Sequence, residues 1–186
     1  DPRFWGWLWQ IEEEVRHNVP MIYYHVWDNY PYPTYNKANY DSNDFIATIS
    51  KVTDDIVANV SPDVGRQYIP HAVDLDLFKP LEDEFVKQIR EDNFKDDKDK
   101  FIVFWNNRNA RRKMGASLIL WFKEFLDQVG HDKAVLLMHT NPRDQAGSNL
   151  ESLIEELGLS TGQVLFSREK LHPGNLAAMY NMVDCT

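Results

Sequence analysis

The sequence is poor in cysteine and has no long apolar run. Cys185 is the one cysteine among 186 residues, so an internal disulfide bond is excluded, as is typical of a protein from a reducing compartment. No stretch approaches the roughly 20 consecutive apolar residues that cross a bilayer. The first residues also lack the apolar core of a signal peptide. These absences predict a cytoplasmic protein with no transmembrane segment.

Positive charge is also scarce. Lys and Arg number 20 against 29 Asp and Glu, which gives a formal net charge of −9. So acidic a chain is a poor general binder of nucleic acid or anionic membranes, and we expect no nucleic-acid partner. Peripheral membrane contact is left open. An anionic ligand would have to be held by a local basic cluster, so the position of such a cluster is informative.

Short apolar runs alternate with amphipathic segments along the chain. Near-continuous apolar runs are typical of strands that are buried on both faces of a parallel sheet. They predict strands at residues 21–26, 44–49, 67–69, 101–105, 134–139 and 163–166. Helical periodicity predicts helices at residues 5–16, 51–60, 114–129, 148–157 and 173–182. The alternation indicates an α/β fold with doubly wound sheets.

The ends and faces of these helices can be predicted as well. Ser50 is placed to cap the helix at 51–60, and Gly130 follows the helix at 114–129 where glycine commonly ends helices. Within that longer helix, one apolar face is predicted from side chains that recur at helical spacing: Leu118, Trp121, Phe122, Phe125 and Val129.

A charged segment divides the chain. Residues 81–100 are dense in Asp, Glu, Lys and Arg, which is typical of an exposed helix at 82–91 followed by a solvated connector. We therefore predict a linker at 81–100 between a domain at 1–80 and another at 101–186. The sequence starts at Asp1-Pro2 and stops in an apolar stretch at 183–186. We expect both domains to be incomplete, with further sequence at least on the C-terminal side.

Two common phosphate-binding motifs are absent. The sequence has neither a Walker A pattern nor G-x-G-x-x-G, which disfavours a P-loop ATPase or a dinucleotide-binding fingerprint. Instead, the strand predicted at 101–105 runs through a polar turn into the helix predicted at 114–129. This junction lies at the sheet edge where α/β proteins bind ligands. It carries four cations, namely Arg108, Arg111, Arg112 and Lys113.

The basic loop has two interpretations. Arg offers a planar fork to phosphate oxygens, Lys supplies a mobile charge, and the free N–H groups of a helix start favour an anion. The alternative is a solvated basic patch. Cations at a helix N-terminus oppose the helix dipole, so their presence favours the phosphate site.

Three segments carry a family resemblance. Residues 69–80 have the sequence IPHAVDLDLFKP, which is similar to the family pattern IPHGVDxxxFxP. Asn107-Arg108 followed by Lys113-Met114-Gly115 is similar to the family pattern GR…K-G. Residues 176–184 have the sequence LAAMYNMVD, which is similar to the family pattern LxxLYxxAD. In order and spacing, over most of the chain, they resemble glycosyltransferase family 4 ("glycosyl transferases group 1"). This family consists of retaining enzymes with the GT-B fold.

The resemblance implies two Rossmann-like parallel-sheet domains. Residues 1–80 would end the acceptor-side domain, and 101–186 would begin the domain that binds the nucleotide sugar. Arg108 and Lys113 fall on the family's diphosphate-binding pair, and His25 falls on the strand-end histidine that faces the transferred sugar, a catalytic role. Asn107 replaces a family glycine, and this substitution reduces the conformational freedom of the backbone at that position. The family's E-x₇-E motif would lie beyond the end of this sequence.

Other residues are weaker candidates. Asn107, Arg112, Arg143 and Arg168 are further candidates for contact with the donor; a surface turn is the alternative for Arg143. On the residues alone His25 is more often a satisfied structural histidine, and the resemblance favours function. The aromatic residues of the 23–35 segment could stack on sugars or form a rigid cap over the sheet edge.

The resemblance thus implies a hexosyltransferase-type enzyme. It would move a sugar from a nucleotide-diphosphate donor to a glycan, lipid or small-molecule acceptor, with retention. No cofactor and no metal are expected, because the cationic loop and helix dipole would do the work of a metal. The alternatives are a non-catalytic nucleotide- or sugar-binding module and a GT-B-fold nucleotide-sugar epimerase. By itself this fragment is expected to have negligible transferase activity.

Overall fold

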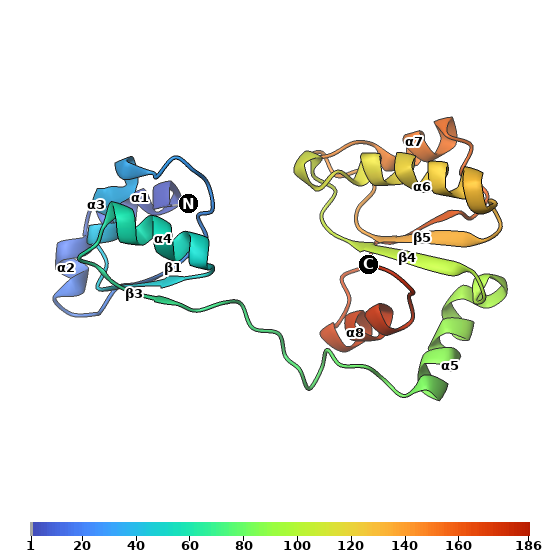
Figure 1. Cartoon of the computed structure of the whole chain (residues 1–186), viewed down its shortest axis with the longest axis horizontal. Coiled ribbons are helices and arrows are strands. Elements are labelled where there is room, and N and C mark those ends of the chain that lie inside the picture. Colours follow the sequence, from blue (N-terminus) through green and yellow to red (C-terminus); the bar gives the residue numbers. More distant parts are fainter. Residues whose placement is uncertain (1) are drawn as a thin grey trace. The chain divides into compact units, whose positions relative to one another are not determined.

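The chain folds into two compact units. The structure, a computed structural model, describes residues 2–186. It divides into unit 1, Asp1–Val73, and unit 2, Asp74–Thr186, each with its own parallel three-stranded sheet (Figure 1). Residues 69–73, at the end of unit 1, are exposed and have no regular secondary structure. The division at Val73 differs from the domain end expected at residue 80.

Unit 1 is built on the strand order β1-β2-β3. Its elements are η1 (Pro2–Trp5), α1 (Gly6–Trp9), α2 (Glu12–Arg16), β1 (Ile22–His25), η2 (Thr34–Asn36), α3 (Lys37–Asp41), β2 (Phe45–Thr48), α4 (Lys51–Val60) and β3 (Gly65–Tyr68). The helix expected over residues 5–16 is broken into two short helices with no buried residue in either. Nothing in this segment packs deeply enough to hold one continuous helix.

The core of unit 1 lies between its sheet and helices α3 and α4. Tyr40 of α3, Ile46 of β2 and Ile56 of α4 are fully buried. The predicted cap is confirmed, because Ser50 accepts a hydrogen bond from the backbone N–H of Thr53, at 3.1 Å.

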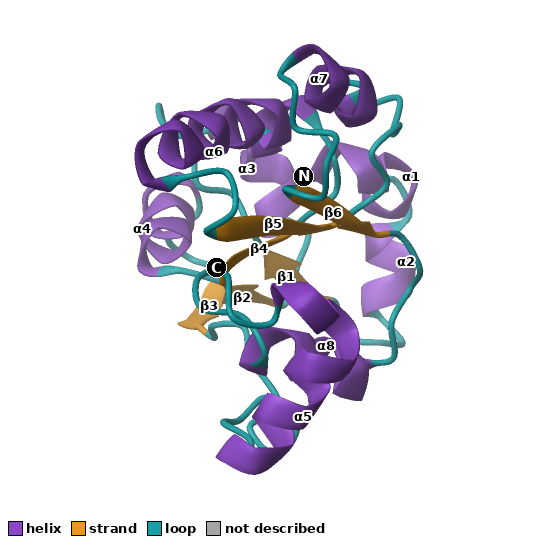
Figure 2. Ribbon diagram, turned by 90° about the vertical axis from the view of Figure 1, so that its right-hand side faces the viewer, coloured by secondary structure: helices purple, strands orange, loops and turns teal. Residues whose placement is uncertain are grey.

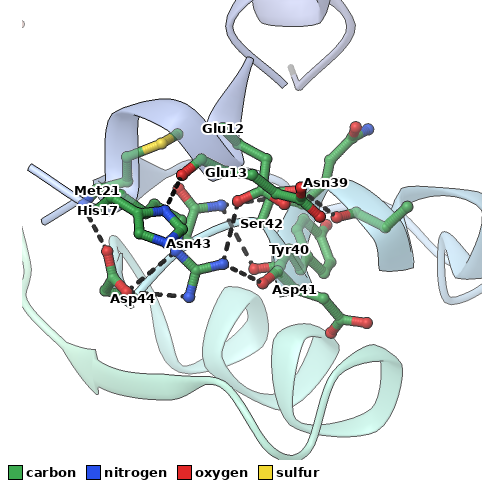
Figure 3. Close-up of polar contacts among 12 residues, drawn as sticks. Glu12, Glu13, His17, Met21, Asn39, Tyr40, Asp41, Ser42, Asn43 and Asp44 are labelled. Atoms are coloured by element: carbon green, nitrogen blue, oxygen red, sulfur yellow. Dashed lines mark hydrogen bonds and ion pairs between the residues drawn. The ribbon is translucent and has the colours of Figure 1, made fainter. Parts of the chain in front are cut away.

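A polar cluster holds α2 against the starts of β1 and β2 (Figure 3). Asp44 accepts a hydrogen bond from the backbone N–H of Met21 at 2.7 Å and two from the Arg16 guanidinium at 3.0 and 3.1 Å. The Met21 bond, and next the Arg16 bond, lower the pKa of the Asp44 carboxyl. These contacts lie at the amino ends of the strands, away from the edge where parallel sheets bind ligands.

Unit 2 has the strand order β4-β5-β6. Its elements are α5 (Asp83–Phe94), η3 (Lys95–Asp97), β4 (Phe101–Asn106), η4 (Arg111–Lys113), α6 (Gly115–Val129), β5 (Ala134–His139), α7 (Leu150–Glu156), β6 (Val164–Ser167) and α8 (Pro173–Asn181). Cys185, in the apolar stretch at 183–186, also makes a parallel bridge with Val103 of β4.

The sheet of unit 2 is covered on both faces. Helices α6 and α7 lie over one face and α5 and α8 over the other (Figures 1 and 2). Successive residues of β5 therefore enter different cores: Leu136 packs with Ile119 and Phe122 of α6, and Leu137 packs with Phe94 and Met179. This is the doubly wound arrangement expected from the near-continuous apolar runs.

Two expectations for unit 2 are corrected. Residues 81–100, expected as a linker, lie within unit 2; Phe94 is 7% exposed, and Arg90 donates to the carbonyls of Lys98 and Lys100, both at 2.6 Å. The high charge density concealed an apolar stripe on α5. The buried side of α6 consists of Gly115, Ile119, Phe122 and Leu126, whereas three members of the expected face, Trp121, Phe125 and Val129, are exposed.

Candidate functional site

The ligand edge of unit 2 is formed by the carboxyl ends of three strands. Asn106, His139 and Ser167 end β4, β5 and β6 and lie side by side in the parallel register. His139 and Ser167 also share a hydrogen bond of 2.8 Å between Nδ1 and Oγ. The loops that follow, residues 107–114, 140–149 and 168–172, all start from this edge. The sheet topology alone therefore brings the basic loop beside the loop that follows β5.

The basic loop runs directly into helix α6. Residues 111–113 form a 3-10 turn, Met114 takes a left-handed conformation with φ 55° and ψ 31°, and α6 begins at Gly115 without a side-chain cap. A Cβ on Gly115 would lie 3.1 Å from the indole ring of Trp105, so glycine lets the helix start pack against the end of β4. Without a side-chain cap, the first N–H groups of α6 can bind an anion.

Arg108 is held by a forked ion pair. Its Nε donates to Oδ2 of Asp144 at 2.7 Å, and its Nη2 donates to Oδ1 at 3.0 Å. The Arg108 side chain is 70% exposed, whereas that of Asp144 is 17% exposed. The Arg108 guanidinium and the backbone N–H of Ala146 lower the pKa of Asp144 to about 2, and Asp144 in turn raises the pKa of Arg108. The pair is therefore fully ionised at neutral pH.

Asn109 joins the basic loop to the loop after β5. It is 2% exposed, and its amide Nδ2 donates to the carbonyls of Pro142 at 3.2 Å and Ser148 at 2.7 Å. The backbone N–H of Arg111 also donates to the carbonyl of Ala146, at 3.0 Å. A Cβ on Gly147 would collide with both the side-chain and the backbone oxygens of Asn109. The two loops are thus packed as one structure.

Lys113 differs from Arg108 in its environment. Its side chain is half-buried, and in the part of the chain that the structure describes neither it nor Arg111 or Arg112 forms an ion pair. Their positive charges lie on the turn that leads into α6 and are not neutralised by neighbouring carboxylates. Asn107 is half-buried, and the positive φ of this loop falls at Met114, so the backbone at Asn107 does not require glycine.

Arg143 and Arg168 lie together through a shared carboxylate. Both pair with Glu151 of α7, whose side chain is 19% exposed, and Arg168 also lies 5.8 Å above the ring of Phe166. The structure therefore brings these two candidates together on the ligand edge of unit 2. The Glu151 carboxylate partly neutralises the positive charge of both arginines.

His25 is enclosed in unit 1. It is fully buried, its Nε2 lies 2.7 Å from the hydroxyl of Tyr40, and its ring packs on Tyr23 at 5.0 Å. Burial lowers the pKa of His25 to about 4. The imidazole is buried and neutral, but among the described residues its Nδ1 has no hydrogen-bond partner, so His25 is not a fully satisfied structural histidine. The predicted contact with a transferred sugar stays a prediction.

The aromatic loop after β1 is anchored to α4. The hydroxyls of Tyr30 and Tyr32 both donate to Asp55, at 3.4 and 3.0 Å, and their rings meet edge to face at 5.4 Å. These bonds attach the loop to the middle of α4. The rings of Tyr30 and Tyr35 remain more than half exposed.

Three residues of the site were not found from the sequence. Asp144, Asn109 and Gly147 act through contacts between loops; Asp144, for example, is 36 positions from Arg108. No local motif marks such pairs. The available signal was the position of Asp144 just after a predicted strand, next to the candidate Arg143.

Comparison with known proteins identifies the fold. No family model and no curated protein sequence matches the chain. Among solved structures, the apo structure of OtsA has a TM-score of 0.64 at 12% identity, covering 95% of this chain and 48% of that one. Trehalose-6-phosphate from E. coli bound with UDP-2-fluoro glucose gives 0.63 at 14% identity, covering 95% and 49%. A glycosyltransferase from Rickettsia africae gives 0.58 at 16%, covering 94% and 52%.

These similarities confirm the predicted fold class. The chain has the α/β architecture of the GT-B glycosyltransferases, with parallel sheets in two units. It spans about half the length of the solved structures that it matches. None of the helices within residues 2–186 is both long enough and apolar enough to cross a membrane.

Proposed function

We propose that the chain is part of a glycosyltransferase that takes a sugar from a nucleoside-diphosphate donor. The observation that carries the proposal is the cationic turn at the start of α6, with Arg108 and Lys113 at the carboxyl edge of a parallel sheet. Its support is the GT-B fold, which is shared with glycosyltransferases. One similar structure is described as bound to UDP-2-fluoro glucose, so we propose a uridine diphosphate sugar as the donor.

The geometry suits stabilisation of a leaving diphosphate. When the bond between the sugar and the diphosphate breaks, negative charge develops on the phosphate oxygens. Arg108, Lys113 and the free N–H groups of α6 are already in place, so little reorganisation is needed as this charge grows. We propose transfer with retention to an acceptor that is a glycan, a lipid or a small molecule.

Binding of nucleoside diphosphates tests the site. Charge-assisted hydrogen bonds contribute roughly 1.5–3 kcal/mol each, so losing two of them should weaken binding by at least about 100-fold. We expect UDP to raise the melting temperature of the chain more than GDP or ADP does. Calorimetry should show no measurable UDP binding to the double variant Arg108→Ala, Lys113→Ala.

The matched control is Lys123→Ala on the same helix. Lys123 pairs with Asp127 at 2.6 Å on the exposed side of α6, so its loss removes a positive charge without touching the turn. UDP affinity should be unchanged in this variant. An unchanged affinity in the double variant would contradict the proposed diphosphate site. Binding of UDP with no transfer from any UDP-sugar, measured on the full-length protein, would favour a binding module instead.

A further inference from the structure

We propose that Asp144 is a positioning residue that holds the Arg108 guanidinium in the orientation that binds the donor diphosphate. The inference rests on the proposed function of the basic loop and adds a residue to it. Asp144 follows β5, whereas Arg108 follows β4, so their pairing depends on the packing of the two loops.

The forked pair leaves part of the guanidinium free. A guanidinium carries five N–H groups. Asp144 accepts from Nε and from one N–H of Nη2, at 2.7 and 3.0 Å. Both N–H groups of Nη1 and the second of Nη2 remain for an anion. Because the Arg108 side chain is 70% exposed, this free edge is accessible to a ligand.

Asp144 is itself fixed by the loop that carries it. Its Oδ1 also accepts from the backbone N–H of Ala146 at 2.9 Å. The carbonyl of Ala146 accepts from the backbone N–H of Arg111 at 3.0 Å, and buried Asn109 bonds to the same loop. Several hydrogen bonds thus hold the loop that carries Asp144 against the basic loop, and they fix the position of the carboxylate.

Two opposing effects follow from this pairing. The carboxylate partly neutralises Arg108 and repels a diphosphate, but a diphosphate at the exposed edge of the Arg108 guanidinium would be surrounded by solvent and salt, which weaken that repulsion. It also removes the rotamer freedom that a long, exposed arginine would otherwise lose on binding. The guanidinium is pre-oriented and keeps three donors, so we expect the gain from positioning to exceed the repulsion. Removing the pair should weaken UDP binding about tenfold.

The test is a double-mutant cycle on the whole chain, read by calorimetry with UDP. Asp144→Asn keeps an oxygen for the N–H of Ala146, so the loop turn is preserved while the ion pair is removed. We expect about tenfold weaker binding in Asp144→Asn than in the wild type. In an Arg108→Ala background the same substitution should have no effect, because the guanidinium that it positions is gone. Asp144→Glu, which keeps the charge, should recover part of the affinity.

Each contrary outcome has its own meaning. Tighter UDP binding by Asp144→Asn would show that the carboxylate competes with the ligand, which overturns the inference. An equal loss in the Arg108→Ala background would show that Asp144 merely maintains the loop, and would overturn it as well. Wild-type chain that binds none of UDP, GDP and ADP would instead contradict the proposed function, and the inference with it. Melting temperatures within a few degrees of the wild type confirm that each variant is folded.

Discussion

At the residue scale, buried His25 makes the stability of unit 1 depend on pH. Its pKa is about 4 in the folded chain, compared with about 6.5 in an unfolded chain. Between these values only the unfolded state takes up the proton, so stability falls as pH drops from about 6.5 toward 4. Relative to His25→Gln, the wild type should lose about 2 kcal/mol more between pH 7.5 and pH 5.

Amide hydrogen exchange at Ile49, which directly follows β2, measures this effect within unit 1. The backbone N–H of Ile49 donates to the carbonyl of His25 and reports on the same strand pair. His25→Gln keeps a polar group that can bond to Tyr40, so the fold is preserved while the titration is removed. Equal pH dependence of exchange in the two proteins would mean that His25 is accessible to protons in the folded state.

Gly147 is a second residue whose role depends on one neighbour. An added Cβ would meet both oxygens of Asn109, one of which is backbone and cannot rotate away. Gly147→Ala should therefore destabilise unit 2 by about 1–3 kcal/mol and weaken UDP binding, because the loops separate. Gly174→Ala is the control, since its Cβ would have only ordinary contacts at 3.6 and 3.9 Å. Urea unfolding and calorimetry of both variants check the prediction, which fails if the two behave alike.

At the scale of elements, α6 supplies a matched pair of phenylalanines. Phe122 is 4% exposed and packs into the core, whereas Phe125 is 37% exposed. Phe122→Ala should cost about 3–5 kcal/mol of unfolding free energy. Phe125→Ala should cost about 1 kcal/mol, because less of its surface leaves water on folding. If the two variants lost equal amounts of unfolding free energy in urea denaturation, Phe125 would be as buried as Phe122, as the sequence predicted.

For α6, the sequence predicted the extent of the helix but not its buried side. Its extent was predicted almost to the residue, as was β5 at Ala134–His139, because a long apolar period marks an element clearly. Its buried side was predicted wrongly because α6 has apolar residues around most of its circumference. The pattern cannot then show which side meets the sheet. Unit 2 buries Ile119, Phe122 and Leu126 and leaves Trp121 and Val129 exposed.

The candidate site divides in a similar way. A strand, a turn and a helix in succession predicted that the basic loop at 108–113 lies at the ligand edge, and the family resemblance then singled out Arg108 and Lys113, whose role in binding stays a prediction. Asp144 and Asn109 were not found, because their roles depend on the packing of two loops from different strands. Pairings of this kind follow from the folded backbone and have no local pattern.

At the scale of the whole molecule, the division at Val73 predicts that unit 2 can fold and bind UDP by itself. The proposed diphosphate-binding residues Arg108 and Lys113, and Asp144, which positions Arg108, all lie in Asp74–Thr186. Unit 2 has a hydrophobic core on each face of its sheet. The first part of unit 2 is also bound to the rest of it, because the backbone N–H of Leu81 donates a hydrogen bond to the side chain of Asn181 at 2.9 Å. Unit 2 therefore has what a separately stable domain requires.

A fragment comprising residues 74–186 should fold cooperatively and bind UDP with the affinity of the whole chain, within about twofold. Calorimetry measures the UDP affinity of both proteins. The Arg108→Ala substitution should weaken UDP binding in both, which would confirm that UDP binds at the same site in each. A folded fragment that binds UDP much more weakly than the whole chain would contradict the prediction.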